Sequence, residues 1–247
     1  YILNHPESAK DLSYLRFARS ASAPLSPEIH RRFEERFNIP IIETMGLTET
    51  GSQITTNPMP PAIRKIGSPG TAFGNEIMIA DDTLAAVPTG TIGEILVRGA
   101  NVMQGYLNQP EETAKTISPD GWLRTGDLGY LDQDGYVFVS GRIKELIIKG
   151  GENIAPREID EALLEHEAVL EAAAFAVPCE NYGERVEACI RLKEQVHASA
   201  SDLLAHCQTR LGKFKSPDTI HILEDLPKGP SGKVQRLKLF GLVYPAE

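Results

Sequence analysis

The fold is decided by residues 121–159, GWLRTGDLGYLDQDGYVFVSGRIKELIIKGGENIAPREI. Two β-rich runs flank the turn DQDG at residues 132–135, and this pattern predicts a β-hairpin. Asp127 precedes the turn, and Arg142 follows it, fifteen residues after Asp127. A carboxylate accepts two hydroxyl hydrogen bonds, as from a ribose diol, and a guanidinium donates a fork of them. The two side chains therefore face one polar ligand or form an ordinary surface ion pair, and their spacing is compatible with both.

The residues upstream of this stretch predict an α/β layer. Residues 13–18 are expected to form a strand, residues 27–37 a helix with proline in its first turn, and residues 39–42 a second strand. A polar loop with Thr48 and Glu49 follows, at the edge where α/β proteins bind ligands. Threonine hydroxyls contact phosphate oxygens, and a glutamate is a hard oxygen ligand for magnesium. The alternative is that the same residues cap the next helix.

The rest of the chain predicts two further architectures. Short β-rich runs at residues 76–80 and 93–97 lie between Gly and Pro turns, which is typical of a small β-barrel or sandwich. After Gly141, strands alternate with helices that begin near Pro156 and Ser201, which is typical of a compact α+β domain. The expected fold class is therefore α/β and α+β multidomain, with a large α/β subdomain ending in residues 1–63, a β-barrel-like subdomain at 64–143, and an α+β C-terminal domain at 144–247.

Composition narrows the function classes. The 247 residues carry a formal net charge of −9, which argues against a general nucleic-acid-binding protein. Residues 208–247 nevertheless hold seven Lys or Arg against four Asp or Glu, which favours small anionic ligands, unless these lysines form only a solvated face. The three cysteines have no metal-binding spacing and fit a reduced, cytoplasmic protein. No run is long and apolar enough for a membrane span, and none resembles a signal peptide.

Seven short segments follow one another along the chain: RSASAPL (19–25), ETMGLTET (43–50), KIGSPG (65–70), GEILVRGANVMQGYLNQPEET (93–113), GWLRTGD (121–127), GRIKELIIKGGENIAPREIDEAL (141–163) and LPKGPSGKVQR (226–236). In this order they resemble the adenylate-forming enzymes, a family that includes acyl- and aryl-CoA synthetases, firefly luciferase and the adenylation domains of peptide synthetases. The resemblance covers essentially the whole chain and corresponds to the carboxyl-terminal half of such an enzyme. It implies that the β-barrel-like subdomain completes an adenylate-binding domain and that the C-terminal domain is mobile.

The resemblance also implies a reaction and its site residues. A carboxylate attacks the α-phosphate of ATP and releases pyrophosphate, and a thiol then displaces AMP; the implied cofactors are ATP/AMP, Mg²⁺ and coenzyme A. The residues implied at the adenine site are Ser22, Ala23, Pro24, Glu43, Thr44 and Met45. The other implied roles are phosphate contact for Thr48, Mg²⁺ binding for Glu49, ribose binding for Asp127 and Arg142, the hinge for Lys144, and catalysis for Lys233.

Two glycine-rich loops fit this chemistry. Lys233 lies in a Ser-Gly-Lys loop, where its long side chain can move. Its ammonium would neutralise the negative charge that develops between the carboxylate and the α-phosphate. Without the resemblance, a solvated loop lysine is the simpler interpretation. Gly150 and Gly151 lack side chains and would leave a slot for the pantetheine arm of CoA, although a plain turn explains them equally well.

The chain departs from the family pattern at three points. The Ser/Thr/Gly-rich phosphate loop of the family and most of the acyl pocket have no counterpart in it. Met45 stands where the family usually has an aromatic residue, which weakens stacking on adenine, and Glu43 leaves the neighbouring adenine contact open. We therefore expect the 247-residue chain alone to be inactive, or nearly so, in adenylate formation.

The leading hypothesis is an acyl-CoA synthetase, an AMP-forming acid–thiol ligase, for a small or medium carboxylic acid. The alternatives are an adenylation domain that loads a carrier protein, and a non-catalytic fragment or split subunit that completes the active site of a partner. The expected partners are a carboxylic acid and CoA, together with an upstream domain outside this chain. A homo-oligomer is compatible with the sequence. In the general character of its motifs, the sequence most resembles the fatty-acid and oxalate-type CoA ligases.

Overall fold

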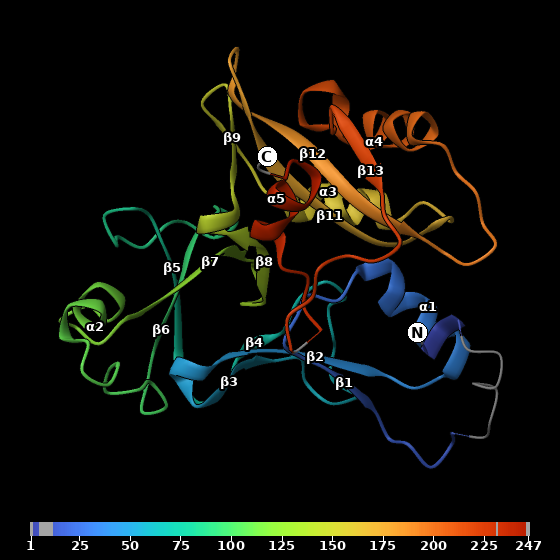
Figure 1. The fold of residues 1–247 in the computed structure, drawn as a ribbon. Helices are drawn as coiled ribbons and strands as arrows, with labels where there is room; N and C mark the ends of the chain where they lie inside the picture. Colours follow the sequence, from blue (N-terminus) through green and yellow to red (C-terminus); the bar gives the residue numbers. More distant parts are fainter. Residues whose placement is uncertain (1, 5–11, 231, 246–247) are drawn as a thin grey trace. The chain divides into compact units, whose positions relative to one another are not determined.

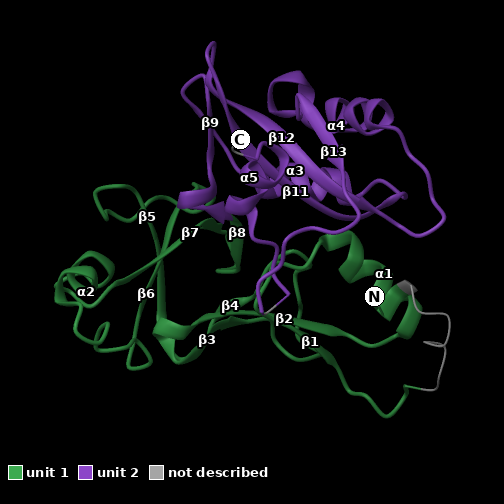
Figure 2. Ribbon diagram, viewed as in Figure 1, with its two compact units in different colours: residues 1–140 green, residues 141–247 purple. Residues whose placement is uncertain are grey.

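The computed structural model describes residues 2–4, 12–230 and 232–245 (Figure 1). The chain divides into two compact units, unit 1 at Tyr1–Ser140 and unit 2 at Gly141–Glu247 (Figure 2). The sequence placed a boundary between residues 141 and 144. Whether residues 1–63, 64–143 and 144–247 act as separate domains stays a prediction.

The first sheet of unit 1 has the strand order β1-β2-β3-β4. Strands β1 and β2 run parallel and are connected by helix α1. Strand β3 pairs antiparallel with β2, and β4 pairs antiparallel with β3. The helix begins with proline at its first turn, as predicted, and is capped at its carboxyl end by Asn38, whose φ of 52° is left-handed. The bounds are β1 Ala18–Ser20, α1 Pro27–Phe37, β2 Ile41–Leu47, β3 Ser52–Thr56 and β4 Thr71–Ala72.

The second sheet of unit 1 has the order β5-β6-β7-β8, with β5 at Glu76–Ala80, β6 at Gly93–Arg98, β7 at Leu123–Leu131 and β8 at Val137–Arg142. The predicted hairpin is therefore confirmed as β7 and β8. The predicted β-barrel is wrong: among the described strands, no pairing joins β5 to β8, and the sheet is open. Four strands are too few to close around a core of side chains. One face instead buries a small cluster that includes Ile79, Ile95 and Val137.

Unit 2 is a five-stranded sheet covered on both faces. Its path is β10-β9-β12-β11, and β13 pairs with β12. Alternate residues of β11 enter different cores: Ala174 packs with the cluster that contains residues of α3 and α4, whereas Phe175 packs with Leu239 of α5. The bounds are η3 Ile143–Glu145, β9 Ile147–Lys149, β10 Glu152–Ile154, α3 Pro156–Leu164, β11 Val169–Cys179, β12 Gly183–Leu192, α4 Ala200–Lys215, β13 Thr219–Ile222, η4 Arg236–Lys238 and α5 Leu239–Val243.

The cysteines are structural thiols. Cys189 and Cys207 are fully buried, and burial raises the pKa of each to about 11. Cys179 is half-buried, and all three are free. Among the described residues, no helix has the length and apolar content that a bilayer crossing requires.

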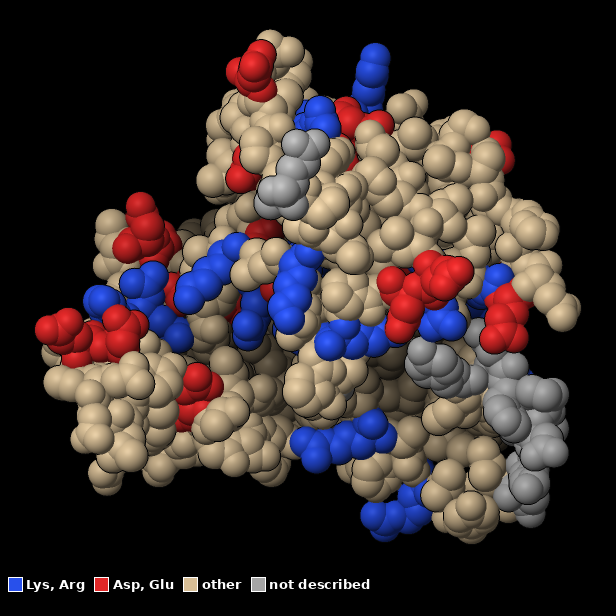
Figure 3. Space-filling view, in the orientation of Figure 1, with Lys and Arg blue, Asp and Glu red and all other residues tan. Residues whose placement is uncertain are grey.

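Many charged side chains are paired within each unit. Lys and Arg lie beside Asp and Glu at several places on the face shown in Figure 3. In unit 1, Lys65 contacts both Asp132 and Asp134 of the β7–β8 turn, and in unit 2 Arg185 lies 2.8 Å from the buried Glu187. On this face, acidic and basic side chains are mixed rather than gathered in one acidic patch (Figure 3).

Glu34 of α1 connects the helix to the first sheet through hydrogen bonds, and we expect this contact to be sensitive to acid. Its carboxylate accepts hydrogen bonds from Arg64, from the Ile41 N–H at 2.6 Å and from His30 at 3.1 Å. Burial acts to raise the pKa of Glu34, but these hydrogen bonds outweigh it and hold the pKa below its ordinary value of 4.5. The unfolded chain therefore binds more protons in this range. The contribution of Glu34 to stability is complete above about pH 4.5 and is lost as the pH falls through its folded-state pKa.

We expect Glu34→Gln to lower the free energy of unfolding near pH 7 by about 2 kcal/mol, because hydrogen bonds to a charged group are lost. The difference from the wild-type chain should shrink as the pH falls below 4.5. Urea denaturation at a series of pH values measures this. The control is Glu28→Gln on the same helix, whose 3.5 Å pair with Arg31 is exposed. Equal pH dependence of the wild-type and Glu34→Gln chains would contradict the assignment.

Candidate functional site

The carboxyl ends of β1 and β2 bring two predicted groups of site residues together. The strands run parallel with Ser20 opposite Glu43, so the loop at residues 22–24 follows β1 directly beside residues 43–45. This edge is where open α/β sheets bind ligands. The predicted polar loop after residue 42 is instead the second half of β2, because residues 44–47 pair with β3. Ser22 turns the chain with a left-handed φ of 74°.

The side chains at this edge point in different directions. Glu43 is 4% exposed, and its carboxylate lies 3.7 Å from the ring of buried His30. Met45 is half-buried. The Thr44 hydroxyl donates to the Ser20 carbonyl at 3.3 Å and accepts from Arg19 at 3.3 Å.

Arg19 was missed by the sequence analysis. Its guanidinium donates to the Thr44 hydroxyl of β2 and, at 3.0 Å, to the Gln53 side chain of β3. It therefore links three neighbouring strands at the edge that carries the predicted adenine residues.

Glu49 lies in a short 3-10 helix, η2, at Thr48–Thr50, directly after β2. The Tyr106 hydroxyl donates a hydrogen bond of 2.9 Å to the Glu49 carboxylate, and the Met103 N–H donates one of 2.8 Å to the Glu49 carbonyl. Burial and then the Glu49 carboxylate raise the pKa of Tyr106, so the phenol stays protonated and remains a donor. Tyr106 therefore orients the carboxylate of Glu49.

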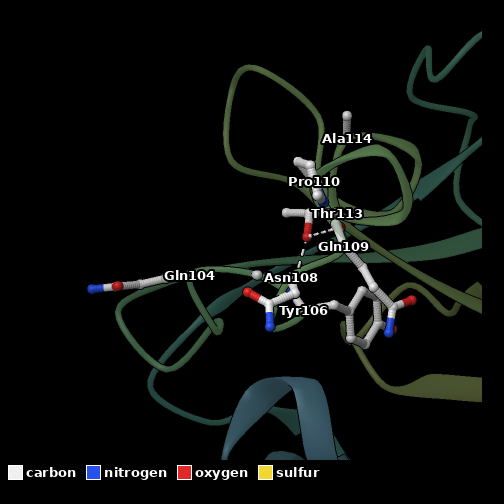
Figure 4. Close-up of a pocket in the computed structure, with 8 residues that line it drawn as sticks. Gln104, Tyr106, Asn108, Gln109, Pro110, Thr113 and Ala114 are labelled. Atoms are coloured by element: carbon white, nitrogen blue, oxygen red, sulfur yellow. Dashed lines mark hydrogen bonds between the residues drawn. The ribbon is translucent and has the colours of Figure 1, made fainter.

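Tyr106 also lines a pocket of about 410 Å³ beside α2, which spans Pro110–Thr116. Figure 4 shows that the Thr113 hydroxyl lies between the backbones of Tyr106 and Gln109 and makes hydrogen bonds of 2.9 Å with both. These bonds hold the segment that carries the Tyr106 ring. The pocket is lined by the loop before α2 and by the first turns of that helix, and this segment supports Tyr106.

The donor set around Glu49 fits magnesium held mainly by a nucleotide. Among the described residues, no three His, Cys, Asp or Glu side chains form a group that could hold a metal ion. Mg²⁺ usually keeps several waters and uses one or two carboxylates together with substrate phosphates. One oriented carboxylate is therefore sufficient.

Asp127 lies on a β-bulge in β7. Glu94 of β6 pairs with Leu128 and Leu96 pairs with Arg124, so residues 125–127 stand opposite a single residue. Gly126 has a φ of 70°, which explains the glycine in Thr-Gly-Asp.

The bulge is held by a buried carboxylate that the sequence analysis missed. Glu94 is 5% exposed and accepts hydrogen bonds from the Gly126 N–H at 3.0 Å and from Arg124 at 2.9 Å. The Thr125 hydroxyl donates to the Ile95 carbonyl at 2.7 Å and accepts from the Asp127 N–H at 3.0 Å. Glu94 and Thr125 therefore fix the backbone on which Asp127 stands.

The remaining predicted residues belong to unit 2. Arg142 ends β8, Lys144 lies in η3, and both are exposed. Because Asp127 belongs to unit 1 and Arg142 to unit 2, their joint contact with one ribose stays a prediction.

Gly150 and Gly151 form the two-residue turn of the β9–β10 hairpin, with φ values of 59° and 84°. A β-hairpin turn with positive φ at both central residues favours glycine. A Cβ added at Gly151 would meet no atom within 4 Å, so this side of the turn is open. The preceding Lys149 is 5% exposed, with its ammonium 5.4 Å from the centre of the Phe214 ring.

Lys233 lies at the far end of a turn in which Lys228 and Val234 form an antiparallel bridge. The Gly229 N–H donates to the Lys233 carbonyl at 2.8 Å, and the Lys233 side chain is exposed. The backbone is therefore fixed while the side chain extends from it.

Comparison with known proteins gives the family. Residues 1–107 match the model of the AMP-binding enzymes, and residues 158–233 match that of the AMP-binding enzyme C-terminal domain. The chain belongs to the adenylate-forming, AMP-binding enzyme family.

Curated relatives of this AMP-binding chain are named as CoA ligases. It is 52% identical over 239 residues to the sulfoacetate–CoA ligase of Cupriavidus necator, covering 97% of this chain and 47% of that protein. It is 39% identical to the oxalate–CoA ligase of Saccharomyces cerevisiae, covering 95% of this chain and 43% of that protein. The chain thus spans about half the length of the curated relatives it matches. Its assignment to their carboxyl-terminal half stays a prediction.

Similarity to solved structures supports the same family assignment. ATP-bound MatB from Rhodopseudomonas palustris is 34% identical with a TM-score of 0.92, over 98% of this chain and 49% of that one. The anthranilate CoA ligase AuaEII in complex with anthranoyl-AMP is 31% identical with a TM-score of 0.89, over 98% of this chain and 47% of that one. The AMP-binding chain therefore shares the fold of adenylate-forming CoA ligases.

Proposed function

We propose that this chain is part of an AMP-forming CoA ligase. The observation that carries the proposal is that the loop at residues 22–24 follows β1 beside residues 43–45 of β2, and that Thr48 and Glu49 come directly after the end of β2. In the proposed reaction a carboxylate oxygen attacks the α-phosphorus of ATP and pyrophosphate leaves. The thiol of CoA then attacks the acyl carbon, and AMP leaves with the electron pair of the broken C–O bond.

The residues of unit 1 bind and orient the nucleotide in this proposal. The β1 and β2 ends hold adenine, the Thr48 hydroxyl contacts phosphate, and Asp127 accepts hydrogen bonds from the ribose hydroxyls. Glu49, oriented by Tyr106, holds Mg²⁺, which supplies positive charge beside the phosphates. Coordinating this charge with a fixed carboxylate avoids reorganisation when the reaction occurs.

The residues of unit 2 act on the reacting groups. Lys233 places its ammonium at the charge that develops between carboxylate and α-phosphate, and Arg142 shares the ribose with Asp127. Lys144 serves as the hinge. The turn at Gly150 and Gly151 receives the pantetheine arm, since no atom would meet an added Cβ at Gly151.

The substrate class we propose is a small carboxylic acid with a second anionic group. Sulfoacetate and oxalate, named for the two relatives above, share this feature. A fatty acid is the second candidate, because a long-chain-fatty-acid–CoA ligase of Bacillus subtilis is 38% identical over 245 residues. The two classes differ in charge at the end remote from the reacting carboxylate, so a panel of acids separates them.

Nucleotide binding tests the proposal without requiring turnover. Calorimetry should show that the chain binds Mg·ATP, and Asp127→Asn should raise the Kd about tenfold or more, because a charged hydrogen-bond acceptor becomes neutral. Asp120→Asn, on a loop of the same unit, is the control. Failure of the wild-type chain to bind ATP or AMP would refute the proposed function.

Turnover is then measured as AMP release over sulfoacetate, oxalate, acetate and a fatty acid, each with and without CoA. CoA-dependent AMP release with the dianionic acids is the expected result for protein that includes the upstream domain. A requirement for a phosphopantetheinyl carrier would favour the adenylation-domain alternative. The inactivity of the 247-residue chain alone stays a prediction, and robust ATP–pyrophosphate exchange by that chain would contradict it.

A further inference from the structure

The segment that carries Lys233 is anchored at both ends within unit 2. At its start, Lys228 lies 2.9 Å from Glu171 of β11 and 2.9 Å from Asp225. At its end, Arg236 begins η4, three residues after Lys233. The backbone between them makes its own hydrogen bonds, from the Gly232 N–H to the Gly229 carbonyl at 2.9 Å and from the Gln235 N–H to the Pro227 carbonyl at 2.7 Å.

Arg236 joins this segment to three separate elements. Its Nη2 lies 2.6 Å from Asp160 Oδ2 of α3, and its Nη1 donates to the Ala174 carbonyl of β11. Its Nε donates to Glu145 Oε2 at 3.1 Å. Glu145 is in η3, next to the predicted hinge residue Lys144. One guanidinium therefore contacts the body of unit 2 and the hinge segment at the same time.

The side chains of this cluster are largely buried. The side chain of Arg236 is 15% exposed and that of Asp160 is 13% exposed. Burial acts to lower the pKa of Arg236, but Asp160 and Glu145 outweigh it and raise the pKa, so the guanidinium stays charged. The Asp160 carboxylate also accepts the Ala174 N–H at 2.6 Å. Removing one partner of such a buried pair leaves an uncompensated charge, which makes the contact difficult to break.

We propose that Arg236 is a positioning residue that fixes the Lys233 segment to the hinge segment η3, so that rotation at Lys144 and placement of Lys233 occur as one movement. This inference rests on the proposed function for the roles of Lys144 and Lys233. The contact between Arg236 and Glu145 is observed in the structure and does not depend on that function. The competing explanation is that Arg236 only stabilises the fold of unit 2.

Glu145 allows the two explanations to be separated. Arg236→Met would break every contact and could unfold unit 2. Glu145→Ala removes only the contact with η3 and leaves the pair with Asp160 intact. Glu145 is also 24% exposed, so water can fill the space that truncation leaves. The conservative Glu145→Gln retains a weaker acceptor for Arg236.

Hydrogen exchange followed by mass spectrometry measures the coupling in the chain itself. In Glu145→Ala, the amides of Gly229, Gly232 and Gln235 should exchange about tenfold faster together with that of Leu146, the change expected when one charge-assisted hydrogen bond is lost. Glu145→Gln should lie between this variant and wild type. Exchange in α4 should not change. The control is Arg210→Gln, which removes an exposed pair with Glu165 of 3.0 Å elsewhere in unit 2.

Every other pattern overturns the inference. Faster exchange confined to residues 143–146 would show that the hinge segment is not coupled to the Lys233 segment. Faster exchange throughout unit 2 would show a role in folding alone, and no change would show that the contact is unimportant.

A second readout connects the coupling to catalysis. In protein active in adenylation, Glu145→Ala should lower kcat about tenfold with little change in the KM for ATP, because placement of Lys233 and not nucleotide binding is affected. An exchange result as expected, combined with no adenylation activity in wild-type protein, would preserve the coupling and refute the proposed function. Normal kcat in Glu145→Ala would refute the positioning role.

Discussion

Replacing Lys233 by methionine is expected to lower the rate of adenylate formation about 10²- to 10³-fold, the loss typical of removing one preorganised group that stabilises transition-state charge. Lys233 is exposed, and no described residue forms a hydrogen bond or ion pair with its ammonium. Its removal therefore deletes no hydrogen bond or ion pair to the described residues. Methionine keeps most of the length of the side chain and removes the charge.

The measurements are ATP–pyrophosphate exchange for the rate and urea denaturation for stability. Stability should equal that of the wild-type protein. Thioester formation from a supplied acyl-adenylate should be largely retained. That step contains no attack of a carboxylate on the α-phosphate, which is the event that Lys233 is proposed to stabilise. Lys238→Met, an exposed lysine in η4, is the matched control. Equal exchange rates for the two variants would exclude Lys233 from catalysis.

Local pattern was sufficient to predict most elements. The proline at residue 27 and the apolar spacing after it predicted α1 with its observed bounds, Pro27–Phe37, and the DQDG turn predicted the β7–β8 hairpin. Long elements in unit 2 were also confirmed, because their periodicity extends over many residues. Helix α4, predicted to begin near Ser201, spans Ala200–Lys215 with a kink at Gly212, whose φ is 73°.

Which strands pair with each other could not be predicted from the local sequence. Residues 43–47 have the composition of a loop, yet they complete β2 because β3 pairs with them. The first predicted strand, residues 13–18, is replaced by Ala18–Ser20, the part that pairs with β2. The barrel prediction failed for the same reason: short strands and turns indicate a β-structure but do not say whether its edges meet.

The site shows the same division. The residues that touch a ligand in the proposed function were found through sequence motifs, whereas those that support them were not. Tyr106 is 57 residues from Glu49, and Arg236 is 91 residues from Glu145. One supporting residue did leave a signal: Glu94 is a charge directly before the apolar run Ile-Leu-Val of β6, and a buried charge requires partners.

Replacing Gly46 by alanine is expected to destabilise unit 1 by about 3 kcal/mol or more, the range of severe overpacking. Gly46 lies in β2, where the pairing with β3 changes register between Met45 and Gly46. A Cβ at this position would overlap the carbonyl oxygen of Ser52 and lie 3.0 Å from the Cα of Gln53. Both obstacles are backbone atoms, so no side-chain rotation relieves them. The two strands would have to separate where η2 begins, which would also displace Glu49.

Urea denaturation that follows the two units separately measures this effect, for example by hydrogen exchange of β2 and of α4 at each concentration. The transition of unit 1 should move to lower urea while that of unit 2 remains in place, and ATP binding should be lost at urea concentrations that the wild-type chain tolerates. Gly241→Ala in α5 makes the same chemical change where an added Cβ meets no atom within 4 Å, and it should be neutral or slightly stabilising. If Gly46→Ala unfolds with the wild-type chain, then β2 and β3 accommodate a methyl group at this register change. Glycine would then not be required there by the fold, and its presence between Met45 and Leu47 would have to be explained by ligand binding at this end of β2.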